Sequence, residues 1–183
     1  MNNYLIKNTQ IVNEGKIIQG EVLIKNGRIE KIASQIETKE AITEINAENQ
    51  FLIPGAIDDQ VHFREPGLTE KATIASESLA ALFGGVTSFM EMPNVNPQTT
   101  TIENLESKFQ IAANTSHVNY SFYLGATNTN IEELKRINTK NTCGVKVFMG
   151  SSTGDTLVDD NHILNQILRD VPALIATHCE CET

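Results

Sequence analysis

The stretch Leu52-Ile53-Pro54-Gly55-Ala56-Ile57-Asp58-Asp59-Gln60-Val61-His62 marks a change in the pattern of the sequence. Before it, apolar residues recur in strand-like runs that have no helical periodicity. After it, short apolar runs alternate with helical stretches of about ten to fourteen residues, a pattern typical of βα units. The sequence therefore predicts two regions, an all-β region at residues 1–53 and an α/β region at residues 54–183.

The first region is expected to hold strands at residues 4–12, 21–25 and 28–33. Asn26-Gly27 separates the last two strands, and this dipeptide supplies the positive φ angles that a type I′ turn requires. A β-hairpin is therefore predicted there. A small sheet, or part of a small β-sandwich, fits residues 1–53 best.

The second region is expected to hold five strands, at residues 56–62, 86–90, 118–124, 144–149 and 173–177. Helices are predicted at residues 73–83, after Thr100, at residues 130–137 and at residues 160–170. Gly84-Gly85 ends the first helix. Thr100 with Glu103 resembles a capping box, and Asn130 and Asp160 are suited to cap the last two helices.

Five strands with four intervening helices make about five-eighths of a (β/α)8 barrel, a fold of roughly 250 residues. The predicted fold is therefore α/β, an incomplete TIM barrel preceded by part of a small β-sandwich. A flavodoxin-like open sheet is the alternative, although it gives no role to the β region at residues 1–53.

Composition excludes several classes of function. The chain has 183 residues, with 14 Lys plus Arg against 23 Asp plus Glu and a net charge of −9, so it lacks the basic surface that nucleic acids need. Its apolar runs are far shorter than the ~20 residues of a membrane span, and no signal peptide is evident. Three cysteines are few for a disulfide framework. A cytoplasmic protein with reduced thiols, a small-molecule substrate and no nucleic-acid or membrane partner is expected.

Three residues are candidates for chemistry because of where they fall on the predicted strands. His62 and His178 lie at the ends of the first and fifth strands, and Lys146 lies within the fourth, where an unpaired ammonium is costly. Each alone could be structural, the histidines as hydrogen-bonded core residues and the lysine with its head group in solvent. Together, at equivalent strand ends, they indicate a metal site on the carboxyl-terminal rim of a barrel.

Four segments resemble one known family, the dihydroorotases of the amidohydrolase superfamily. Asp-Asp-Gln-Val-His-Phe-Arg-Glu-Pro-Gly at residues 58–67 is similar to the family's first-strand signature. Glu-Met-Pro-Asn-Val-Asn-Pro at 91–97 is similar to its Met-Pro-Asn segment. Gly-Val-Lys-Val-Phe-Met at 144–149 and Ala-Thr-His-Cys-Glu at 176–180 match its fourth and fifth strand ends, so the resemblance spans essentially the whole chain.

The resemblance implies a zinc enzyme of pyrimidine biosynthesis that interconverts L-dihydroorotate and N-carbamoyl-L-aspartate at a pair of Zn²⁺ ions. His62 would be the second histidine of a His-x-His pair of ligands, and His178 would bind the second metal. Lys146 would be carboxylated and would bridge the two ions. An ammonium cannot bind zinc, whereas the carbamate formed from a neutral amine and carbon dioxide is an anion that two cations stabilise.

The resemblance also implies two substrate-binding residues. Arg64 would hold the carboxylate of the substrate through its planar guanidinium, and Asn94 would add a directional hydrogen bond. Hydantoinases and allantoinases act on rings without that carboxylate, so Arg64 favours dihydroorotate as the substrate. The alternative role for Arg64 is an exposed ion pair with Glu65.

The sequence departs from the family pattern at Gln60, which stands in place of the first histidine of the pair. An amide oxygen is a weaker zinc ligand than imidazole, so Gln60 indicates either a subfamily feature or a decayed site. Asp58 or Asp59 is an alternative oxygen ligand. Asp155 is an alternative to Lys146 as the bridging group.

The family's remaining metal histidine and its aspartate general base have no counterpart in residues 1–183, so that base is expected beyond the end of this chain. This chain alone is expected to be an inactive fragment. A non-catalytic dihydroorotase-like partner of aspartate transcarbamoylase, another cyclic amidohydrolase, and a homo-oligomer remain open. His117 and His162 are assigned no role, and Cys179 and Cys181 are interpreted as structural rather than metal-binding.

Overall fold

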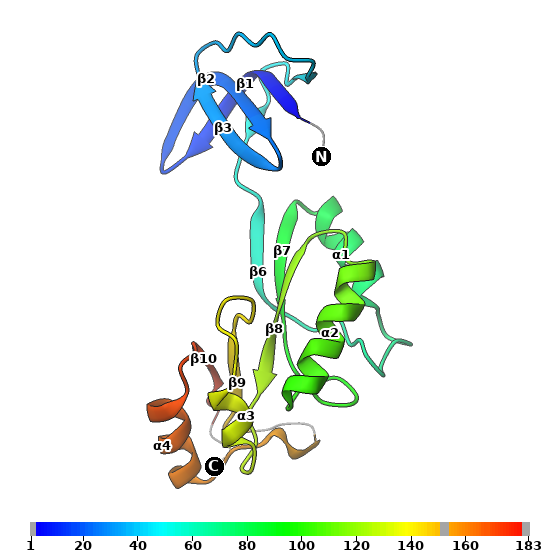
Figure 1. Ribbon diagram of the computed structural model, residues 1–183, viewed down its shortest axis with the longest axis vertical. Helices are drawn as coiled ribbons and strands as arrows, with labels where there is room; N and C mark the ends of the chain where they lie inside the picture. Colours follow the sequence, from blue (N-terminus) through cyan, green and yellow to red (C-terminus); the bar gives the residue numbers. More distant parts are fainter. Residues whose placement is uncertain (1–2, 151–153, 181–183) are drawn as a thin grey trace. The chain divides into compact units, whose positions relative to one another are not determined.

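The structure of the protein is a computed structural model that describes residues 3–150 and 154–180 (Figure 1). Cys181 and residues 151–153 lie outside the described residues. The chain divides into two compact units, Met1–Pro54 and Gly55–Thr183.

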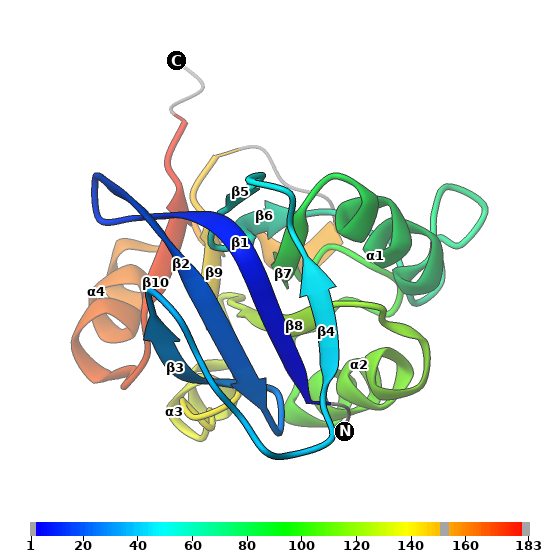
Figure 2. The same cartoon turned by 90° about the horizontal axis from the view of Figure 1, so that it is seen from above.

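The first unit is a five-stranded sheet in which the strands run in the order β3-β2-β1-β4, with β5 also paired to β1 (Figure 2). Its strands are β1 (Tyr4–Asn13), β2 (Lys16–Lys25), β3 (Arg28–Ala33), β4 (Thr43–Asn46) and β5 (Phe51–Leu52). The first three strands are antiparallel, whereas β4 and β5 run parallel to β1. Leu5, Leu23 and Ile36 form its small buried cluster.

Two tight turns connect the antiparallel strands. Asn26 and Gly27 have φ angles of 51° and 75°, which confirms the predicted hairpin between β2 and β3. Glu14 and Gly15, with φ angles of 49° and 72°, form a second turn that the sequence did not predict. Strand β2 consequently begins at Lys16 rather than at residue 21. Glutamate is uncommon at positive φ, so Glu14-Gly15 lacks the sequence signature of such a turn.

The second unit is a parallel sheet with helices in its connections (Figure 1). Its strands are β6 (Ala56–Val61), β7 (Val86–Glu91), β8 (Asn119–Gly125), β9 (Gly144–Phe148) and β10 (Ile175–His178). Its helices are α1 (Ile74–Phe83), α2 (Ile102–Thr115), α3 (Ile131–Lys135) and α4 (Asn161–Asp170), with a 3₁₀ turn at Gly154–Thr156.

The strand order distinguishes between the two predicted folds. In the described part of the chain, each strand from β6 to β10 pairs in parallel with the next strand in the sequence. In a flavodoxin-like sheet the order in which successive strands are added reverses at a switch point. In a barrel each strand is added beside the one before it in the sequence. The predicted α/β fold with an incomplete barrel is confirmed, and the flavodoxin-like alternative is wrong.

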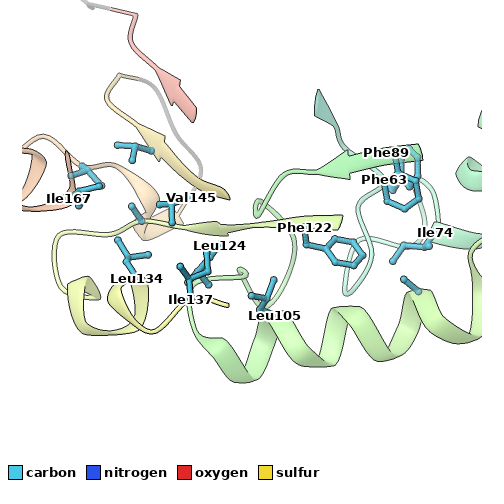
Figure 3. Packing of buried hydrophobic residues seen from close by; sticks show 14 residues of the cluster. Phe63, Ile74, Phe89, Leu105, Phe122, Leu124, Leu134, Ile137, Val145 and Ile167 are labelled. Atoms are coloured by element: carbon cyan, nitrogen blue, oxygen red, sulfur yellow. The ribbon is translucent and has the colours of Figure 1, made fainter. Parts of the chain in front are cut away.

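The hydrophobic core fills the space between one face of this sheet and the helices (Figure 3). The sheet contributes Phe89, Phe122, Leu124 and Val145, and the helices contribute Ile74, Leu105, Leu134 and Ile167. Side chains alternate between the two faces of a strand. Tyr123 and Lys146, which neighbour these core residues, therefore point to the opposite face, the one that would line the inside of a barrel.

The helix starts at α1 and α4 follow the predictions, and those at α2 and α3 need correction. Thr73 caps α1 in a capping box with Ser76, and Asp160 caps α4 by accepting from the backbone N–H groups of His162 and Ile163. The cap of α2 is Thr101, not Thr100: the Thr101 hydroxyl accepts from the backbone N–H of Asn104. The Thr100–Glu103 box was wrong because the helix begins one residue later than the pattern indicated.

Helix α3 is shorter than the predicted range of 130–137, and Asn130 does not cap it through its side chain. The amide of Asn130 instead donates to the carbonyls of Thr100 and Gly125 and accepts from the backbone N–H of Thr127. These bonds tie the loop after β8 to the segment before α2, and the side chain makes no hydrogen bond to the first turn of α3.

Candidate functional site

His62 follows β6 directly, between Val61 and Phe63, which both pack into the core. Its Nδ1 lies 2.8 Å from Oδ1 of Asn94. Because an amide oxygen only accepts, the ring donates from Nδ1 and keeps its lone pair on Nε2. This is the arrangement in which an imidazole is ready to bind a cation.

The surroundings of His62 favour its neutral form. Burial lowers its pKa below 6.5, the hydrogen bond with Asn94 opposes this shift, and the positive charges of Arg64, Lys146 and Lys108 lower the pKa further. A metal ligand must be deprotonated, so the local field supports this role.

Lys146 lies in the middle of β9 and is only 3% exposed. Its Nζ lies 5.1 Å from the ring centroid of Phe148, and no carboxylate within residues 3–150 and 154–180 forms an ion pair with it. Burial lowers its pKa. A larger fraction of Lys146 is therefore in the neutral amine form than for a surface lysine, and the neutral amine is the form that reacts with carbon dioxide.

His178 is the last residue of β10 and is half-buried. Its ring centroid lies 5.8 Å from that of Phe148, the residue opposite it on β9. Its Nε2 lies 3.0 Å from Oε1 of Glu180. A cation bound through Nε2 would have to replace this contact.

Gln60, Asp58 and Asp59 are all exposed on β6. The register between β6 and β7 shifts between Asp58 and Val61, so Asp59 and Gln60 lie in an irregular part of the strand. The Asp58 carboxylate accepts from the backbone N–H of Gln60 at 3.2 Å, and the Tyr123 hydroxyl donates to the carbonyl of Asp59 at 3.3 Å. The side chain of Gln60 makes no hydrogen bond within the described part of the chain.

Asp155 lies in the 3₁₀ turn and not on a strand. It lines a polar hollow of about 650 Å³ together with Gln98, Thr127, Asn130 and Asp159. Its position differs from that of Lys146, which is enclosed within the sheet.

Arg64 has a φ angle of 70°, in the left-handed region that glycine favours. Its Nη1 lies 3.5 Å from the carbonyl oxygen of Asn94. Glu65 forms no ion pair with Arg64 within the described residues, and its Oε2 accepts from the backbone N–H of Ile74 at 2.7 Å. Asn94 thus contacts both His62 and Arg64, and the structure brings these three predicted residues together.

A buried ion pair beside these residues was missed from the sequence. Glu91 ends β7 and Lys108 lies in α2, and the charged atoms are 3.0 Å apart with both side chains fully buried. The signal was helical periodicity, because Leu105, Lys108 and Ala112 share one buried face of α2.

Other polar residues do not join the site. His117 and His162 are exposed. Cys179 is exposed next to Thr177, and Cys143 is half-buried with a pKa that burial raises to about 11. Among residues 3–150 and 154–180, no group of three or more His, Cys, Asp or Glu side chains could hold a metal ion. No helix in the described residues is long and apolar enough to cross a membrane.

The sheet has consecutive parallel strands, a histidine directly after β6, a histidine at the end of β10 and a buried lysine within β9. This combination defines a protein of the amidohydrolase barrel class. The particular family follows from comparison with known proteins. The family model described as Dihydro-orotase-like matches residues 49–180, and the chain belongs to this family.

Individual relatives agree with this assignment. The chain is 33% identical over 180 residues to a dihydroorotase of Methanosarcina acetivorans, covering 97% of this chain and 38% of that protein. It is 28% identical to an L-hydantoinase of Paenarthrobacter aurescens, covering 100% of this chain and 41% of that protein. The solved structure of L-hydantoinase from Arthrobacter aurescens matches with a TM-score of 0.88 and 27% identity, over 100% of this chain and 42% of that one. The chain thus spans about two fifths of the length of these relatives.

Proposed function

We propose that this chain is part of a dihydroorotase, a zinc-dependent enzyme that interconverts L-dihydroorotate and N-carbamoyl-L-aspartate. The observation that carries the proposal is the connection from Arg64 through Asn94 to His62, at distances of 3.5 and 2.8 Å. These contacts support the proposal because they bring the guanidinium that would bind a carboxylate close to an imidazole whose Nε2 is available.

Arg64 is the residue that selects the substrate. L-Dihydroorotate carries a carboxylate on its ring, and a guanidinium binds a planar carboxylate through two parallel hydrogen bonds. Oε2 of Glu65 accepts from the backbone N–H of Ile74, and no ion pair joins Glu65 to Arg64 within the described residues. Asn94 contacts Arg64 through its backbone carbonyl and His62 through its side chain, and so holds the two groups in a fixed relation.

The residues of this chain that would hold zinc are His62, Lys146 as its carbamate, and His178, with Gln60 as a weaker oxygen ligand. The buried Lys146 without a carboxylate partner and the neutral His62 suit this role. Zinc bound there would polarise the amide carbonyl and activate water. The general base is expected outside residues 1–183.

Hydantoinase activity is the second candidate, favoured by the similarity to the L-hydantoinase structure with its TM-score of 0.88. Its substrate lacks the carboxylate, so it leaves Arg64 without a ligand to bind. A non-catalytic partner of aspartate transcarbamoylase is the third outcome, and it requires neither zinc nor turnover.

The test is to assay the full-length protein that carries this sequence, loaded with zinc, against L-dihydroorotate and hydantoin. We expect turnover of dihydroorotate, and Arg64→Met is expected to lower kcat/KM by roughly 100-fold, the effect of losing a charge-assisted contact. Arg136→Met, at an exposed position on the far end of α3, is the matched control. Turnover of hydantoin alone would establish the second candidate, and no turnover with no bound zinc would establish the third.

A further inference from the structure

The Glu91–Lys108 ion pair lies on the helix side of the sheet, outside the candidate metal and substrate residues. Both side chains have no exposed surface, and Nζ of Lys108 lies 3.0 Å from Oε2 of Glu91. Burial raises the pKa of Glu91 and lowers that of Lys108, and the attraction between the two groups opposes both shifts. The ion pair therefore offsets part of the desolvation cost of the two charges. A buried ion pair of this kind often stabilises a protein no more than apolar side chains of the same volume would. Unlike an apolar pair, it makes directional hydrogen bonds to the backbone around it.

The carboxylate of Glu91 holds the backbone that leads into Arg64. Oε1 of Glu91 accepts from the backbone N–H of Phe63 at 3.0 Å and from that of Arg64 at 3.1 Å. Arg64 has a φ angle of 70°, a conformation that a non-glycine residue keeps only when its surroundings impose it. The two hydrogen bonds from one carboxylate are such a constraint.

The ammonium of Lys108 holds the neighbouring loop. Nζ donates to the carbonyl of Met92 at 3.0 Å and lies 5.0 Å from the ring centroid of Phe122. Met92 also donates its backbone N–H to the carbonyl of Val61 at 3.0 Å. Two residues further on is Asn94, which contacts both His62 and Arg64. The ion pair therefore fixes the loop after β6 and the loop after β7 to each other.

We propose that Glu91 and Lys108 are positioning residues for substrate recognition, because together they fix the backbone from which Arg64 and Asn94 reach the substrate. The inference rests on the proposed function and assigns no contact with the substrate to either residue. The carboxylate fixes the backbone of Arg64 in the loop that follows β6. The ammonium fixes the position of Asn94 relative to it.

Two double variants of the full-length protein separate positioning from packing. Glu91→Leu with Lys108→Met removes the acceptor and both charges while keeping the volume. Glu91→Gln with Lys108→Met removes the same charges but keeps one acceptor oxygen for the N–H groups of Phe63 and Arg64. Glu132→Gln with Lys135→Met, an exposed ion pair on α3, is the matched control.

For the Leu/Met variant we expect KM for L-dihydroorotate to rise roughly tenfold while kcat changes less than about threefold, because a displaced Arg64 weakens binding. Bound zinc should stay at the wild-type level, and hydrogen exchange at the amides of Phe63 and Arg64 should become faster. The Gln/Met variant should bring KM back only to about threefold above wild type, because the N–H groups of Phe63 and Arg64 keep their acceptor while the carbonyl of Met92 loses the Lys108 ammonium. The control should match wild type in all four measurements.

An unchanged KM in the Leu/Met variant would overturn the positioning role. A fall in kcat as large as the rise in KM would also overturn it, and so would a loss of zinc in both double variants. If the Leu/Met variant does not fold, the Gln/Met variant decides the matter, since slow exchange at Phe63 and Arg64 with a tenfold higher KM would contradict the proposal. A wild-type protein without activity on dihydroorotate overturns the proposed function itself, and the positioning role falls with it. The two failures are therefore distinguishable.

Discussion

Lys146 and His178 lie on the same face of two adjacent parallel strands. Lys146 is opposite Ala176 in the register of β9 and β10, and His178 is two residues beyond Ala176. With strands about 4.8 Å apart and a rise of about 3.3 Å per residue, their Cα atoms are about 8 Å apart. A carbamate on Lys146 and the imidazole of His178 can span that separation to a shared cation, which is the arrangement that the proposed zinc site requires.

Replacing Lys146 should stabilise the metal-free protein and destroy the proposed site. The ammonium is buried without an ion-pair partner in the described part of the chain, so Lys146→Met removes a desolvated charge while filling the same volume. We expect the free energy of unfolding of the metal-free full-length protein to rise by about 1 kcal/mol, and zinc binding and activity to be lost.

Thermal or denaturant unfolding and zinc content after dialysis are the measurements for this variant. Lys140→Met, at an exposed position, is the control and should change neither quantity. Retention of stoichiometric zinc in Lys146→Met would rule out Lys146 as a ligand and leave Asp155 as the candidate bridge.

The fold was largely predictable because the second unit is built from repeated local patterns. Alternation of apolar runs with helical stretches predicted β6 to β10 and the four helices. The short strands β4 and β5 were missed, since four and two residues are too few to show a period and they are formed by pairing with β1. Such strands form because they pair with a strand far away in the chain, and the local sequence carries no pattern that predicts this pairing.

The cap of α2 provides a test of a boundary that the sequence placed one residue too early. The Thr101 hydroxyl accepts from the backbone N–H of Asn104, so Thr101→Ala should lower the free energy of unfolding by about 1 kcal/mol. Thr100→Ala makes the matched comparison and should cost less than about 0.5 kcal/mol. Denaturant unfolding of the two variants decides between the caps, and a larger loss for Thr100→Ala would contradict the structure.

The candidate site was predictable only in part, for a related reason. His62, Lys146 and His178 could be proposed as candidates because the strand ends of a barrel concentrate functional groups on one rim. The hydrogen bond between His62 and Asn94 and the bonds from Glu91 to the backbone of Arg64 join loops about thirty residues apart, with separations of 32 and 27 residues. Such contacts depend on the three-dimensional arrangement of β6 and β7, which no local pattern specifies.

Cys143 and Cys179 should differ strongly in reactivity. Burial raises the pKa of the Cys143 thiol to about 11, so at pH 8 only about one molecule in a thousand carries the thiolate that reacts. Cys179 is exposed. We expect iodoacetamide to label Cys179 and spare Cys143 in the folded full-length protein, as read by peptide mass spectrometry. Both should be labelled after denaturation, and rapid labelling of Cys143 in the folded protein would contradict its burial.

The pKa of His62 reports on the geometry of the site directly. Burial lowers it below 6.5 and the hydrogen bond with Asn94 works in the opposite direction, so Asn94→Ala should lower the pKa further. Histidine NMR of the metal-free full-length protein measures both values. Because the folded-state pKa is depressed, the unfolded chain takes up the proton first as the pH falls below 6.5. The folded state therefore loses stability from that pH down through the folded-state pKa and gains nothing above it. A His62 titration at or above pH 6.5 would show that desolvation does not dominate its pKa, and an upward shift in Asn94→Ala would show that Asn94 does not stabilise the protonated ring.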